Sequence, residues 1–128
     1  MGKHSDRILD FITFLELCRE ENKEAAVAEI DMDNKTQDIL HDIELREQDQ
    51  YGYIVRGLAL KDIRQKRRQA KNTEEVTKPI VAWMNEHPQT MQDLKKLLQT
   101  TVKIEKRAAN RQYQDRTKII SGLPDEET

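Results

Sequence analysis

Apolar residues recur in this chain at intervals of three and four positions, and long charged stretches separate them. Only 36% of the residues are hydrophobic while 36% are charged, against roughly 45–50% and about 25% in an average domain. So few apolar residues suit narrow seams between long helices better than a globular core. Four glycines and three prolines leave little material for sheets and tight turns. These features predict an all-α fold, an elongated antiparallel helical bundle or hairpin with coiled-coil-like seams.

The first helix is predicted to begin with Ser5 as its N-cap. Its apolar face comprises Ile8, Phe11, Ile12, Leu15 and Cys18. Val27 and Ile30 are expected to continue an apolar face through the charged stretch that follows. The pattern breaks at residues 31–34, which predicts a junction and then a short helix around residues 39–43.

A second long helix is predicted to start near Gln48. Its expected core face comprises Tyr51, Ile54, Val55, Leu58, Leu60 and Ile63. Asn72 with Glu75 resembles a capping box, so the helix is expected to pause there. Pro79 would either kink a continuous helix or sit in the first turn of a new one.

Beyond that point Trp83 and Met84 are expected to lie in the core. A third helix is predicted to begin at Thr90, as N-cap. Its seam comprises Met91, Leu94, Leu98 and Val102, which keeps close to a heptad period. If nothing covers this seam it would lie in water, so a homo-oligomer is expected.

The charge is split along the chain, although the net charge is only −2. Residues 1–50 carry 14 acidic and 6 basic side chains, whereas residues 51–118 carry 7 acidic and 16 basic ones. We expect residues 1–118 to form a single helical domain and residues 119–128 to be a flexible acidic tail. The two halves either face different partners or face each other.

The sequence contains no complete catalytic or metal-binding motif. A calcium-loop-like stretch that starts at Asp31 has Thr36 where a glycine is needed and Asp42 where a bidentate glutamate is needed. The Asp38-x-x-His41 pair occurs once, and a di-iron bundle needs it twice. We therefore predict a protein that is not an enzyme, with no catalytic residues, metal or cofactor. The single Cys18 and the lack of a signal peptide or membrane span favour the cytoplasm.

Two sets of basic residues are the candidate binding site. They comprise Arg56, Lys61, Arg64, Arg67, Arg68 and Lys71, then Lys103, Lys106, Arg107 and Arg111. Helical spacing places Arg64, Arg67, Arg68 and Lys71 on one stripe, which is expected to be exposed. Such a stripe could bind nucleic acid, since each neutralised phosphate releases counterions. It could equally bind an acidic protein or pair with the chain's own acidic half, and Tyr113 is the only aromatic residue beside a basic set.

Residues 37–118 contain several segments in an order seen in other small proteins. The segments are Asp38–Glu44, Leu60–Arg68, Pro79-Ile80, Lys103–Lys106 and Arg111-x-Tyr113. In these the chain resembles a family of small helical proteins of Gram-positive phages and prophages, but it has Asn72 where an acid is expected and Gln99 where a glycine is. The resemblance implies an accessory role, as adaptor or inhibitor of a host enzyme or an antiviral nuclease. Protein binding is thus the leading hypothesis, and nucleic-acid binding the alternative.

Overall fold

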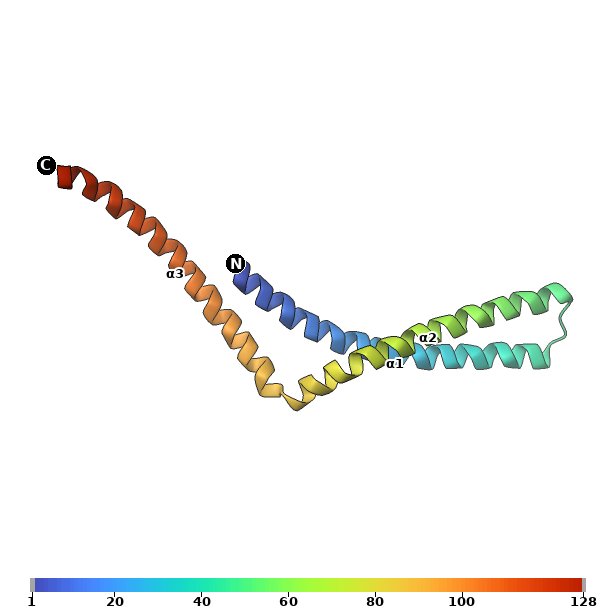
Figure 1. The fold of residues 1–128 in the computed structure, drawn as a ribbon. Coiled ribbons are helices and arrows are strands. Elements are labelled where there is room, and N and C mark those ends of the chain that lie inside the picture. The colour runs from blue at the N-terminus through green and yellow to red at the C-terminus, as the bar shows by residue number, and fades with distance from the viewer. Residues whose placement is uncertain (1, 128) are drawn as a thin grey trace. The chain divides into compact units, whose positions relative to one another are not determined.

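Three long helices make up the described chain. The computed structural model describes residues 2–127, with side chains for residues 2–111. The helices are α1 (Lys3–Leu45), α2 (Gln50–Glu86) and α3 (Pro88–Glu127) (Figure 1). No strand occurs in residues 2–127, so the predicted all-α fold is confirmed. The predicted flexible tail, residues 119–128, lies outside the residues whose side chains are described.

The chain divides into two compact units. The larger unit, Leu15–Glu86, is a hairpin in which the C-terminal part of α1 runs antiparallel to α2 (Figure 1). The smaller unit joins Met1–Phe14, at the start of α1, to His87–Thr128, which contains α3. In it, the predicted α3 seam from Met91 to Val102 is half-buried rather than open to water.

The hairpin is held by a seam of heptad type. Its buried and half-buried positions alternate in steps of three and four along both helices, as coiled-coil packing requires. On α1 they are Leu15, Cys18, Asn22, Ala25, Glu29, Met32, Thr36, Ile39 and Ile43. On α2 they are Arg56, Leu60, Ile63, Arg67, Ala70, Glu74, Thr77, Val81 and Met84. The seam is thus narrow, and polar or charged side chains interrupt it.

The predicted interruptions within the helices are absent. α1 continues through residues 31–34, because Met32 is buried in the seam and the Thr36 hydroxyl donates a hydrogen bond to the Met32 carbonyl at 2.9 Å. α2 likewise passes through Asn72 without a pause. Pro79 lies inside α2 and begins no new helix, although it lacks the donor for the carbonyl four residues earlier.

Several side chains predicted to be buried face solvent. Tyr51, Ile54, Val55 and Leu58 are 74%, 53%, 42% and 63% exposed, because α2 turns its Arg56–Leu60–Ile63 side to α1. On α1, Val27 and Ile30 are also exposed. Of the two residues near the end of α2 that are predicted to lie in the core, Met84 is only 1% exposed, whereas Trp83 is 39% exposed.

Two predicted helix caps are wrong. Ser5 lies inside α1, where its hydroxyl donates to the Gly2 carbonyl at 2.9 Å. Thr90 lies inside α3, which begins at Pro88 because proline suits the first helical position. The amide of Thr90 donates to the His87 carbonyl, which starts the helix two residues earlier than predicted.

Asp49 is the N-cap residue of α2, and its substitution is expected to lower the stability of the fold. Its Oδ1 accepts a hydrogen bond from the Gly52 amide at 2.7 Å, one of the first-turn donors that lack a helical partner. We expect Asp49→Ala to lower the free energy of unfolding by about 1 kcal/mol. Urea denaturation followed by circular dichroism measures it, with Glu47→Ala as the matched loss of a loop carboxylate. Equal stability of the two variants would contradict the cap.

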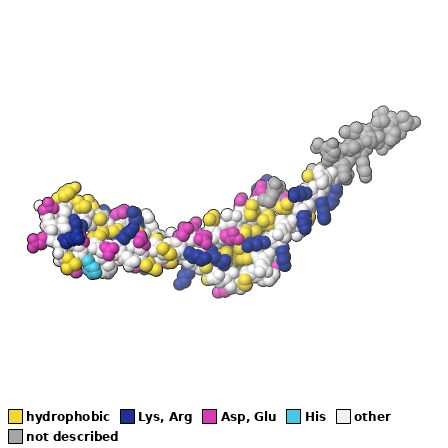
Figure 2. Space-filling view, turned by 180° about the vertical axis from the view of Figure 1, so that it is seen from behind, with side chains coloured by type: hydrophobic (Ala, Val, Ile, Leu, Met, Phe, Trp, Pro, Cys, Tyr) yellow, Lys and Arg dark blue, Asp and Glu magenta, His cyan; other side chains and the backbone are white. Residues whose placement is uncertain are grey.

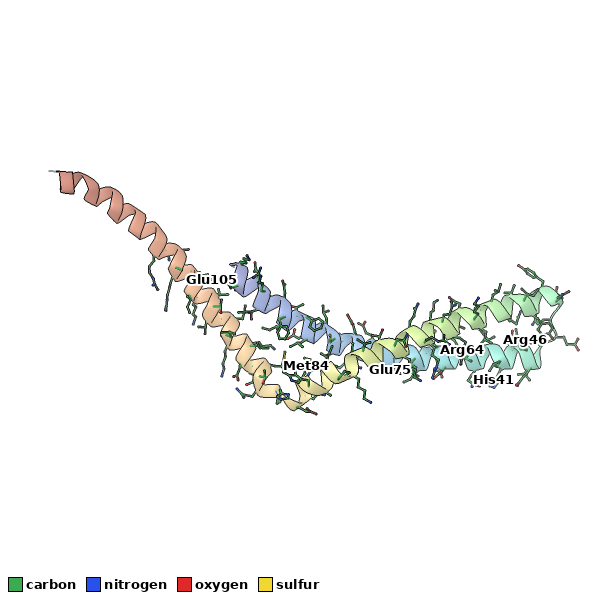
Figure 3. The ribbon with its side chains drawn as sticks, in the orientation of Figure 1. His41, Arg46, Arg64, Glu75, Met84 and Glu105 are labelled. Atoms are coloured by element: carbon green, nitrogen blue, oxygen red, sulfur yellow. The ribbon has the colours of Figure 1, made fainter. Side chains whose placement is uncertain are left out.

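In the smaller unit, the carboxyl group of Glu105 on α3 lies against the first turn of α1 (Figure 3). Polar contacts with the Ser5 side chain and with the backbone of Ser5, Gly2 and His4 lower the pKa of its carboxyl. A Cβ on Gly2 would come within 2.1 Å of Glu105 Oε2, so a larger residue there would displace the end of the Glu105 side chain. The carboxylate also suits the positive end of the helix dipole.

Candidate partner-binding surface

Two of the predicted binding cations are engaged within the hairpin. Arg56 forms an ion pair with Asp42 and donates to the Gly52 carbonyl at 3.1 Å. Arg67 reaches from α2 to two carboxylates of α1, Glu29 at 3.2 Å and Asp33 at 2.6 Å. The hydrogen bond with Asp33 raises the pKa of the Arg67 guanidinium, so this charge is fixed.

The other cations of the α2 set face outward. Lys61, Arg64, Arg68 and Lys71 are exposed, and none forms an ion pair with a described residue. We call these four residues the outer basic stripe. Together with Gln65 and Arg67 they line a hollow of about 460 Å³ along α2. Arg64, exposed on α2, is labelled in Figure 3.

A pair of carboxylates lies beside this stripe in the seam. The Glu74 carboxyl hydrogen-bonds to Glu29, and this bond, with burial and repulsion by Glu29, raises the pKa of Glu74. Nearby, Asn22 Nδ2 donates to Thr77 Oγ1 at 3.0 Å. A second hollow of about 400 Å³ is lined by Asn22, Glu29, Lys71, Glu74, Glu75 and Lys78. The two hollows together therefore present both signs of charge.

The predicted cations of α3 lie in the other unit. Lys103, Lys106, Arg107 and Arg111 are all exposed, and none forms an ion pair with a described residue. The remaining basic residues of that stretch, Arg116 and Lys118, lie outside the residues whose side chains are described. The structure thus assigns the two basic sets to separate units.

The residues considered for chemistry are not gathered. Asp38 and His41 are both exposed on α1, with His41 labelled in Figure 3. Within residues 2–111, no three histidine, cysteine or acidic side chains are grouped in a way that could hold a metal ion. Cys18 is buried in the seam, and burial raises the pKa of its thiol, which makes it a weak nucleophile. In the described part of the chain, no helix carries an apolar stretch long enough to span a bilayer.

Sequence reasoning missed the charged residues that the hairpin uses internally. Glu29 and Glu74 occupy seam positions, which a search for apolar periodicity passes over. The signal that could have found them is the spacing itself. Glu29 lies seven residues after Asn22, and Glu74 seven residues after Arg67, so a heptad frame extended through polar positions includes all four.

Comparison with known proteins identifies no similar protein. No protein-family model, curated protein or solved structure matches the chain. The resemblance to small phage proteins therefore stays a prediction from the residues that carry it, and the functional argument depends on the surface described above.

Proposed function

We propose that the hairpin of α1 and α2 is a non-enzymatic binding module whose outer basic stripe holds an acidic surface of a protein partner. One observation carries this proposal: four exposed cations without an ion-pair partner among the described residues line one hollow of the hairpin. Charges that a fold does not use for itself are available to a partner. The resemblance to phage proteins suggests the partner class, a host or antiviral-defence protein that the chain holds as adaptor or inhibitor.

The neighbourhood of the stripe favours a protein over nucleic acid. α1 runs beside α2, and its residues 15–45 carry ten acidic and three basic side chains. Figure 2 shows acidic and basic side chains interspersed on one face of the hairpin. A phosphate backbone laid along α2 would be repelled by these carboxylates, because it offers negative charge only. A protein surface can match both signs.

Reversing two of the four charges tests the proposal. We expect Arg64→Glu with Arg68→Glu to weaken binding of a labelled polyglutamate peptide by roughly tenfold or more, measured by fluorescence anisotropy. Both sites are exposed, so each change should cost within about 0.5 kcal/mol of stability. The matched control is Lys103→Glu with Arg107→Glu, which alters the net charge equally in the other unit. Equal peptide affinity of parent and stripe variant would contradict the proposal.

Nucleic-acid binding is the second candidate, and the exposed α3 cations favour it. If it holds, duplex DNA, single-stranded DNA or RNA should bind better than polyglutamate, and both double variants should weaken that binding. Affinity should then fall linearly on a log–log salt plot, by roughly one power per phosphate contact. A protein partner predicts a milder salt effect, mainly on the association rate. Affinity capture from a bacterial lysate, with parent and stripe variant side by side, then identifies the partner.

A further inference from the structure

Lys71 is a lining residue of both hollows of the hairpin. It lines the first hollow with the other cations of the outer basic stripe, and it lines the second with the carboxylates of Glu29 and Glu74. The two hollows therefore adjoin at Lys71. A negative charge that is bound in the first hollow consequently lies near the carboxylates of the second.

Arg67 makes a similar connection through the seam. It lines the first hollow, and its Nη2 lies 3.2 Å from Oε1 of Glu29, the residue whose carboxyl bonds to Glu74. In the hairpin alone, the positive charge of Arg67 favours the ionised form of the Glu74 carboxyl and lowers its pKa. Carboxylates of a partner that are drawn to Arg67 and Lys71 offset part of this positive charge.

The Glu29 and Glu74 carboxyl groups are placed to hold a proton there. Both residues are half-buried, and their mutual bond and repulsion, with partial desolvation, favour a protonated Glu74. The other charged residues that face the pair are Asp33 of α1, which contacts Arg67, and Arg67, Lys71, Glu75 and Lys78 of α2. Among the described residues, no histidine lines either hollow. A proton that is taken up beside the stripe at mildly acidic pH therefore goes to this pair.

We infer that the Glu29–Glu74 pair takes up a proton when an acidic partner binds the outer basic stripe. The inference rests on the proposed function and adds a regulation of the same site. The negative charges of the partner make the fully ionised pair less favourable, as any nearby like charge does. The coupling is reciprocal, so the proton also raises the affinity for the partner. Binding should therefore tighten as the pH falls from about 7 towards about 5.

The strength of this coupling is limited by screening. Charges within a Debye length of one another, roughly 8–10 Å at physiological salt, still interact. The cations of the stripe lie between the partner and the pair, which reduces the effect. We expect the affinity to differ by roughly threefold between the two pH values, and by less at high salt.

Isothermal titration calorimetry of the full chain tests the coupling directly. The probe is an oligopeptide of cysteic acid, because its sulfonates stay ionised throughout this pH range and the probe itself takes up no proton. Titrations near pH 6 in two buffers of different ionisation enthalpy count the protons that accompany binding. The parent should take up part of one proton per bound peptide, and its affinity should be higher near pH 5 than near pH 7.

Two single substitutions locate the proton. Glu74→Gln removes the group that takes it up, so this variant should bind the peptide near pH 7 about as tightly as the parent does near pH 5. Its proton uptake should be smaller than that of the parent, since exposed histidines contribute equally to both chains. Glu75→Gln removes the same charge at an exposed position one residue away, labelled in Figure 3, and should keep the proton uptake of the parent.

The outcomes separate this inference from the proposed function. If the peptide binds at neither pH, the proposed function is wrong and the inference fails with it. If the parent binds the peptide without proton uptake, the inference alone is overturned. Uptake that is as large in Glu74→Gln as in the parent, or lost equally in Glu75→Gln, also overturns it.

Discussion

Arg67→Glu is expected to destabilise the hairpin strongly, although the sequence places Arg67 on a stripe of exposed cations. Its guanidinium bridges Glu29 and Asp33 across the seam, with only 28% of its side chain exposed. The substitution removes both ion pairs and adds a carboxylate beside Glu29, Asp33 and Glu74. Removing one partner of a partly buried charge network leaves the others uncompensated. We expect the melting temperature to fall by on the order of 10 °C.

Arg68→Glu is the matched control for that prediction. It makes the same charge change one residue further along α2, at an exposed position without an ion pair in the described structure. Thermal melts followed by circular dichroism should show little change for it. Adding Glu29→Lys to Arg67→Glu should regain part of the lost stability, because it restores one opposite pair. If Arg67→Glu and Arg68→Glu melt alike, the charges in the seam are solvated surface pairs.

The contrast between neighbouring arginines shows where sequence reasoning succeeds and where it ends. Helix content follows from composition, because few glycines and prolines and many charged helix formers leave little alternative. Apolar periodicity predicts a packed face at Leu15, Cys18 and Ile63, and these residues are buried or half-buried. Which side of α2 packs against α1 depends on both helices together, and so it cannot be derived from the sequence of α2 alone. The stripe at Tyr51–Leu58 is the more apolar side, yet the helix buries the Arg56 side, where Asp42 supplies the complementary charge.

Tertiary packing also overrides local sequence preferences at residues 31–34, where a break in α1 is predicted. Asp33 and Asn34 are frequent N-cap residues, and they led to the predicted break in α1. Asp33 is instead an ion-pair partner of Arg67, and Met32 beside it fills a seam position. The heptad frame thus continues where propensity predicts an end. The predicted set of cations on α2 splits into engaged and outward-facing residues for the same reason. Spacing gives the direction of a side chain around one helix, but it does not give the partner that the side chain meets.

Glu74→Gln should stabilise the hairpin at neutral pH and remove part of its pH dependence. The Glu74 carboxyl has a raised pKa, first because it hydrogen-bonds to Glu29 and then because it is partly desolvated and repelled by Glu29. A carboxyl whose pKa is higher in the folded state contributes stability that is fully present below its unfolded pKa. That stability is lost as the pH rises through the folded pKa. The parent should therefore melt at a higher temperature near pH 5 than near pH 7.

Glutamine at position 74 keeps a group that can donate to the Glu29 carboxylate and removes the charge that repels it. The variant should consequently melt above the parent at pH 7, and the gap should close towards pH 5. The window must stay above the ordinary glutamate pKa, because the Glu105 pKa is lowered and its contribution is lost as the pH falls through that value. Glu75→Gln, at an exposed position one residue away, is the control for net charge. A gap between parent and Glu74→Gln that is equally wide at both pH values would mean that the two carboxylates do not share a proton in the folded hairpin.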